Sequence, residues 1–250
     1  MHMKNVRVLN ANAIKFLAAA IMVIDHVGLL FFPQTAIFRY IGRVSMPLFA
    51  FAVSEGCRYT KNKTKHFALM FGLALLCQIV YYVAMHSLYM CILVTFSLSV
   101  LTIYALQNFK KSLFQNGLFK EKVLSGSVLA VTVLLVWRLC GVLEVDYEFW
   151  GCMLPVFASI LDFRGIENVP NALKKWDCLP ARIVCMGVGL LLLCFSYYPA
   201  GSPFFALLSL PVLMLYNGEK GKANTKYFFY VFYPTHLVFL QGLFWLLQML

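Results

Sequence analysis

Long apolar runs separated by short polar loops constrain this chain more than any other feature. A helix needs about 20 apolar residues to cross the ~30 Å hydrocarbon core of a bilayer. Only 12% of the residues are charged, well below the share in a soluble domain. We therefore predict an all-α, polytopic transmembrane helix bundle, organised as one domain over residues 1–250. The nine apolar runs are 13–32, 38–57, 66–86, 90–107, 123–143, 149–161, 183–198, 204–216 and 227–248.

Two of these runs, 149–161 and 204–216, are short, and each contains a proline (Pro155 and Pro211). We expect both to be tilted, broken or re-entrant. The first run follows basic residues, as a signal peptide does, but the alanines at 18–20 come too early for a cleavage site. We therefore interpret it as an uncleaved first span.

The distribution of basic residues among the loops predicts the orientation. Cytoplasmic loops are rich in Lys and Arg, which explains the net charge of +11 without a nucleic-acid partner. Basic loops alternate here with loops that contain no Lys or Arg, and this pattern predicts about nine spans with the N-terminus cytoplasmic and the C-terminus outside. Arg39, Arg43 and Arg138 depart from it, toward the outer ends of spans. The loops without basic residues are 33–37, 87–89, 144–148 and 199–203.

The first span carries Lys15 and the dipeptide Asp25-His26. At 100° per residue, Lys15 and His26 lie on nearly one helix face, roughly 16 Å apart along the axis. Histidine suits proton transfer because its pKa lies near neutrality, and Asp25 could orient it or raise its basicity. The alternative is a structural histidine held by a hydrogen bond between helices.

The second span brings Arg39 and Arg43 together at positions i and i+4. Paired arginines recognise phosphates or carboxylates through forked hydrogen bonds; the alternative is an ion pair with Asp146, Glu144 or Asp25. Glu55 points about 120° away from Arg43 on an unbroken helix, although Pro47 could change that angle. Glu55 could equally be a structural bridge to Arg58 or Lys61.

Two later positions add candidates. Asp146 lies in the acidic loop before the sixth run, and His236 lies near the middle of the last run, just after Pro234. A proline frees a backbone carbonyl and lets a helix bend around a cavity. A second intramembrane histidine makes a two-histidine site a reasonable hypothesis, against the alternative of a packing hydrogen bond.

Several reaction classes find no motif in the sequence. It contains no serine nucleophile elbow, P-loop, dinucleotide fingerprint or HExxH. The eight cysteines show no CxxC or Cys/His ligand spacing. We therefore expect no metal site.

Several stretches together resemble the TraX family, whose name comes from the protein that N-acetylates F pilin. The resemblance spans residues 15 to 237, and the GR-x3-P-x-FAF-x3-EG segment is its specific part. The Lys15–His26 spacing is also similar to the basic-x10-His feature of multispan bacterial acyltransferases that modify sugars. The stretches are KFLAAAIMVIDHVGLLFFP, RYIGRVSMPLFAFAVSEGCRYTKN, QIVYY, DYEFWG and FYPTHL.

The resemblance implies a multi-pass acyltransferase of the bacterial plasma (inner) membrane that uses acyl-CoA, such as acetyl-CoA, as donor. His26 with Asp25 would be catalytic. In one departure from the family pattern, Cys91 and Ile92 stand where an asparagine is usual, so donor or acceptor preference could differ. The residues expected to line the substrate site are Arg39, Arg43, Glu55, His236, Lys15 and Asp146.

In this interpretation, acyl-CoA approaches from the cytoplasm, attracted by Lys61, Lys63, Lys65 and the basic cluster at 110–122. The acceptor is an extracytoplasmic peptide, glycan or lipid headgroup, and we do not expect F pilin itself. The alternatives are a proton-coupled transporter or exporter, since intramembrane charges also suit that function, and a structural partner in a secretion or conjugation complex.

Overall fold

The structure is a computed structural model that describes residues 7–86, 88–115, 118–197, 199, 202–223 and 225–249. In these residues the regular elements are helices, and the only β-type pairings are two isolated bridges. The chain forms two compact units. Unit 1 comprises Met1–Ala52 and Cys194–Leu250, and unit 2 comprises Val53–Leu193. The boundaries between them fall inside two helices, α3 (Ser45–Tyr59) and α9 (Leu179–Ser196).

Seven segments of the described chain are long and apolar enough to cross a membrane. The all-helical membrane architecture predicted from the sequence is therefore confirmed. The two short runs are also short here: α7 (Glu148–Phe157) has ten residues, and 3-10 helix η2 (Ser202–Leu208) is followed by α10 (Ser209–Met214). The sidedness of the termini stays a prediction. The seven segments are Ala11–Phe31, Ala36–Tyr59, Lys63–Val83, Ile92–Phe114, Phe119–Val142, Leu179–Ser196 and Tyr227–Met249.

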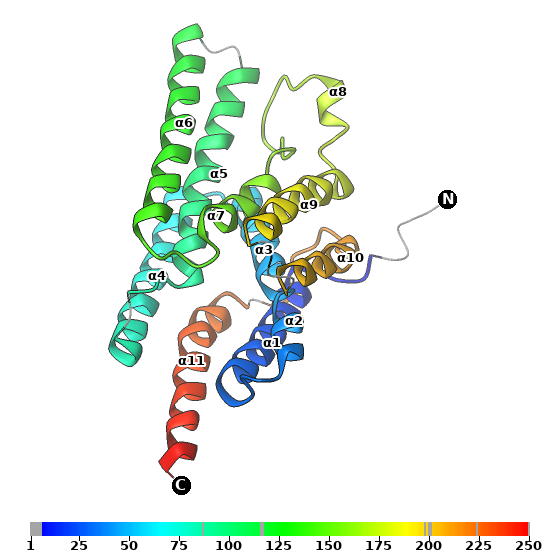
Figure 1. The fold of residues 1–250 in the computed structure, drawn as a ribbon. Helices are drawn as coiled ribbons and strands as arrows, with labels where there is room; N and C mark the ends of the chain where they lie inside the picture. The colour runs from blue at the N-terminus through cyan, green and yellow to red at the C-terminus, as the bar shows by residue number, and fades with distance from the viewer. Residues whose placement is uncertain are drawn as a thin grey trace. The chain divides into compact units, whose positions relative to one another are not determined.

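Unit 1 is built around α1 (Ala11–Phe31), which packs against α2 (Ala36–Gly42) and α11 (Lys226–Met249) (Figure 1). Asn10 caps α1 by accepting a hydrogen bond from the backbone N–H of Ala13 at 2.9 Å. The buried Asn12 side chain donates to the carbonyl of Ala223 at 2.7 Å and accepts from the Thr225 hydroxyl at 2.9 Å. These bonds tie the start of α1 to the segment that leads into α11.

The second span is not one helix, because it breaks between α2 and α3 at Arg43 and Val44. Pro47 explains the position of the break. A proline lacks the N–H that would bond to the carbonyl four residues earlier, which belongs to Arg43, and its ring crowds that carbonyl. Pro47 itself is tolerated because it lies in the first turn of α3. Ser45 then ties α3 to α1 by donating to the carbonyl of Ala18 at 2.7 Å.

Unit 2 contains α4 (Lys63–Met85), α5 (Ile92–Phe114), α6 (Phe119–Val142), α7 and α8 (Asn171–Lys174), with the C-terminal half of α3 and most of α9. α5 is its central element and packs against α4, α6 and α7 (Figure 1). Its hydroxyls bond outward: Thr95 donates to the carbonyl of Asp146 and Ser99 to that of Cys152, both at 2.7 Å.

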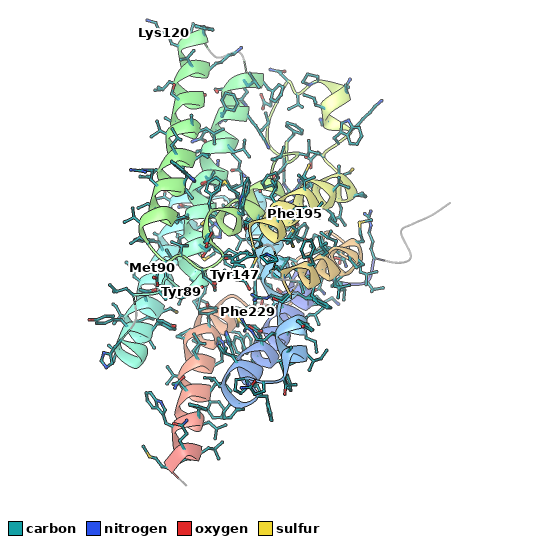
Figure 2. The ribbon with its side chains drawn as sticks, in the orientation of Figure 1. Tyr89, Met90, Lys120, Tyr147, Phe195 and Phe229 are labelled. Carbon is teal, nitrogen blue, oxygen red and sulfur yellow. The ribbon has the colours of Figure 1, made fainter. Side chains whose placement is uncertain are left out.

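Two connections of unit 2 meet where α4 leads into α5 and α6 into α7. The backbone N–H of Met90 donates to the carbonyl of Glu144 at 2.8 Å, and Asp146 donates back to Met90 at 3.1 Å. The Tyr89 hydroxyl donates to the Asp146 carboxylate at 2.7 Å. Figure 2 labels Tyr89 and Met90 at this junction. The acidic loop is therefore held by backbone pairing as well as by its side chains.

Replacing Gly28 by alanine tests the packing of α1 on α2. A Cβ at this position would collide with the Cβ and ring of Phe38, which cannot move without shifting α2. We expect a loss of about 1–3 kcal/mol in the free energy of unfolding, measured by thermal denaturation in detergent. Gly72→Ala is the matched control, because nothing lies near its added Cβ. Equal stability of the two variants would contradict the close approach of α1 and α2.

Candidate functional site

Unit 1 brings together the two histidines of the first and last spans. Nδ1 of His26, on α1, lies 3.1 Å from Nε2 of His236, on α11. The rings are nearly parallel, with an interplanar angle of 15° and centroids 5.2 Å apart. These residues stand 210 positions apart in the chain, so the contact depends on the packing of α1 against α11.

The hydrogen bonds of His236 fix the tautomers of the pair. Nδ1 of His236 lies 2.9 Å from the carbonyl oxygen of Phe232, which can only accept, so this Nδ1 carries a proton. In a neutral imidazole the other nitrogen, Nε2, then accepts, and Nδ1 of His26 must donate to it. Nε2 of His26 is left with its lone pair, which is the form a general base requires.

The local sequence of α11 holds the His236 ring in this orientation. Its side chain stacks on Phe232, with centroids 4.9 Å apart and an interplanar angle of 9°, and Tyr233 lies edge-on at 5.6 Å. Only 7% of His236 is exposed. Pro234 lies within α11, and the Thr235 hydroxyl donates to the carbonyl of Val231 at 2.8 Å. The ring is therefore fixed by its own helix as well as by His26.

An ion pair lies beside the histidines in sequence. Nη1 of Arg39 donates to Oδ2 of Asp25 at 2.7 Å. Gly42 makes room for this carboxylate, because a Cβ there would collide with it. Of the partners proposed for the arginines, Asp25 is therefore the one that Arg39 takes. Asp25 bonds to Arg39, whereas the hydrogen-bond partner of His26 is His236.

Two buried polar atoms in unit 1 have no hydrogen-bond partner among the described residues: Oδ1 of Asp25 and Nε of Arg43. Leaving such groups unpaired costs about 1–3 kcal/mol each. One is an acceptor and the other is a donor, so together they could orient a polar substrate. Lys15 also lies in α1, eleven residues before His26.

Glu55 and Asp146, the other predicted site residues, belong to unit 2. Glu55 forms a buried ion pair with Arg182 of α9, with 2.6 Å between Oε1 and Nη1. The expected bridge from Glu55 to Arg58 or Lys61 is therefore replaced by one to Arg182. Arg182 also donates to the Ser54 hydroxyl at 3.2 Å and to the carbonyl of Ala158 at 3.0 Å.

Arg58, which was one expected partner of Glu55, pairs with two aspartates: its Nη1 donates to Asp162 at 2.8 Å and to Asp177 at 2.6 Å. Lys110 is buried and donates to the carbonyls of Ser159 at 2.7 Å and Asp162 at 3.0 Å. This ammonium stabilises the turn after α7, so Lys110 is not a surface cation of the basic cluster at 110–122. The expectation that the cluster attracts phosphates therefore does not extend to Lys110.

Sequence reasoning missed the acidic members of this network and the role of Arg182. The signal that could have found them is the position of Asp162, Arg182 and Glu55 at the ends of apolar runs, next to the polar loops. Among the described residues, no three His, Cys, Asp or Glu side chains gather as a metal-ligand set. An anionic group has a better candidate position, because Arg58, Arg164 and Lys174 line one cavity in unit 2.

Removing Arg182 tests the ion pair of unit 2. Arg182→Met deprives Glu55 of its guanidinium partner in a site where both side chains are at most 7% exposed. We expect a loss of about 3–5 kcal/mol in the free energy of unfolding, measured by denaturation in detergent. The double variant Glu55→Gln, Arg182→Met removes both charges and should recover a large part of that loss. A double variant no more stable than the single one would contradict this assignment.

Comparison with known proteins identifies the family of this chain. The family described as TraX protein matches residues 10–244, nearly the whole chain. The uncharacterized protein RP591 of Rickettsia prowazekii (strain Madrid E) is 34% identical over 106 residues. That match covers 42% of this chain and 40% of the relative's length. No solved structure matches. The family match includes α1, the broken second span and most of α11, and so both His26 and His236. The chain therefore belongs to the TraX family.

Proposed function

We propose that this protein is an integral membrane acyltransferase that moves an acyl group, typically acetyl, from acyl-CoA to an amine or hydroxyl. The observation that carries the proposal is the hydrogen bond between Nδ1 of His26 and Nε2 of His236, which leaves Nε2 of His26 as a base. Membership of the TraX family supports it, because the family takes its name from a pilin-acetylating protein. We place the protein in the bacterial plasma membrane.

In the proposed reaction, Nε2 of His26 takes a proton from the acceptor as its nitrogen or oxygen attacks the acyl carbon. The carbon–sulfur bond breaks, and the CoA thiolate leaves with the proton from His26. While protonated, His26 donates through Nδ1 to Nε2 of His236, whose own Nδ1–H is held by the carbonyl of Phe232. A neutral histidine thus stabilises the transient imidazolium.

The neighbouring ion pair supplies binding groups in this mechanism. Oδ1 of Asp25 can accept a hydrogen bond from the amine or hydroxyl that receives the acyl group, which makes Asp25 the second catalytic candidate beside His26. The Nε–H of Arg43 can donate to a substrate oxygen or to the oxyanion of the tetrahedral intermediate. Arg39 holds Asp25 in place, and Lys15 is a further binding candidate on α1.

The acceptor in this proposal reaches the site from the extracytoplasmic side and is a peptide, glycan or lipid headgroup. The proposal follows from the outward position predicted for Arg39 and Arg43. Glu55 and Asp146, which the sequence predicts as substrate-binding residues, belong to unit 2. The buried ion pair of Glu55 suggests that it acts through the packing of α3 and α9 and does not touch the substrate.

Replacing His26 by alanine tests the general base. We expect transfer of label from radioactive acetyl-CoA into membrane peptides, glycans or lipids to fall by about 10²–10⁴-fold. The assay uses vesicles that contain the full chain, with membranes from cells lacking it as acceptor. His86→Asn is the matched control, because His86 is exposed and its left-handed backbone suits asparagine. Full activity of a folded His26→Ala variant would overturn the proposal.

Substitutions of His236 test its supporting role separately. A glutamine carbonyl can accept the hydrogen bond from Nδ1 of His26, whereas leucine cannot. We therefore expect His236→Leu to lower the rate of acetyl transfer by roughly 10–100-fold, and His236→Gln to retain most of it. The pH dependence of the rate should shift in the leucine variant and stay near that of the native protein in the glutamine variant. Identical rates and profiles in both variants would exclude His236 as the partner of the base.

A further inference from the structure

Unit 2 contains a cavity of about 230 Å³ that the proposed chemistry does not use. It lies between the end of α3, the loop after α7 and the segment from α8 to Asp177. The cavity is open to one side, so it can hold a small charged group while the rest of a larger ligand lies outside. Its charged lining consists of Arg58, Arg164, Lys174 and Asp177.

The balance of charge in this lining favours an anion. Three of the four ionisable side chains are cationic, and Asp177 is already bonded to Arg58 at 2.6 Å. The positive charges of Arg164 and Lys174 are therefore not balanced by the cavity's own acid. Asp162, the other carboxylate on Arg58, is only 4% exposed.

Arg58 is held rigidly and keeps one edge of its guanidinium for a ligand. Only Nη1 donates to the two carboxylates, Asp162 and Asp177. The Nε–H is buried and has no acceptor among the described residues. Nε and Nη2 form the side edge of a guanidinium, which binds a phosphate or carboxylate through two parallel hydrogen bonds. An anion oxygen would satisfy the donor that the protein leaves unpaired.

The same two carboxylates, Asp162 and Asp177, also hold the backbone of the loop that carries Arg164. Asp162 accepts from the backbone N–H of Arg164, and Asp177 accepts from that of Phe163, both at 3.1 Å. The Arg164 guanidinium lies over the Tyr59 ring, 4.0 Å from its centroid. Arg58 and its loop are thus arranged before any ligand arrives, which lowers the entropy cost of binding.

We propose that this cavity binds a phosphate or diphosphate group, and that the group belongs to the acyl-CoA donor. The assignment of the donor rests on the acyl transfer proposed above, while the affinity for phosphate follows from the cavity alone. The cavity would hold the phosphate end of the donor and leave its acyl arm outside. An anionic lipid headgroup carries the same chemistry and is the other source to be distinguished.

Neutralising the cations of the cavity tests the proposal. Full-length protein in nanodiscs of zwitterionic lipid is titrated with CoA, and with pantetheine, which has the same thiol arm but lacks the phosphates. We expect Lys174→Gln and Arg164→Gln each to raise the Kd for CoA about tenfold, the effect of one charge-assisted hydrogen bond. Pantetheine binding should not change. Lys175→Gln is the matched control, because Lys175 is exposed and does not line the cavity.

The outcomes separate this site from the proposed activity. Transfer of acetyl groups with an unchanged Kd for CoA in both variants would overturn the phosphate site and leave the acyltransferase intact. Binding of inorganic pyrophosphate that depends on Lys174 and Arg164, without binding of CoA, would keep the anion site and overturn the donor assignment. Native mass spectrometry in nanodiscs that contain phosphatidylglycerol tests the lipid headgroup as the ligand. Retention of that lipid in place of CoA would likewise overturn the donor assignment. Because Lys174 is exposed, its substitution leaves the fold intact.

Discussion

Pairing of buried charge is the constraint on which this structure depends. A charge in hydrocarbon costs at least about 2.5–3.5 kcal/mol on insertion scales. Each compact unit of this chain offsets that cost with an ion pair. Arg39 pairs with Asp25 in unit 1, and Glu55 with Arg182 in unit 2. The second pair joins residues 127 positions apart, so it can form only when α3 and α9 are correctly packed. These pairs therefore specify which helices become neighbours.

The same constraint shapes the histidine pair. A carboxylate bonded to His26 would place another negative charge among apolar helices, whereas His236 orients the ring and stays neutral. The nearby Asp25 is already compensated by Arg39. The histidine pair thus carries no charge while both rings are neutral, and charge appears on it when His26 takes a proton. Nδ1 of the protonated His26 still donates to Nε2 of His236, and this hydrogen bond reduces the cost of forming the ion.

Hydropathy was sufficient to predict the membrane class, the seven long spans and the two short runs, because these depend on local composition. The break at Arg43 and Val44 follows from Pro47 by a fixed offset of four residues, so it was within reach of the sequence. The partner of Glu55 was not. Arg182 is distant in the chain, and nearby Arg58 offered an equally reasonable bridge until the fold gave Arg58 to Asp162 and Asp177. Lys110 was misplaced for the same reason: it lies near the end of α5, and only tertiary packing turns its side chain inward.

The carbonyl of Phe232 ends the hydrogen-bond chain that runs from His26 through His236. A peptide carbonyl is far too weak a base to take the Nδ1 proton of His236, so a proton gained by His26 cannot be passed along this chain. It must leave through the atom by which it entered. The pair therefore returns a proton to the same face of the site from which His26 took it, and does not conduct protons across the membrane. That property suits a transferase, in which the leaving group collects the proton the acceptor gave up.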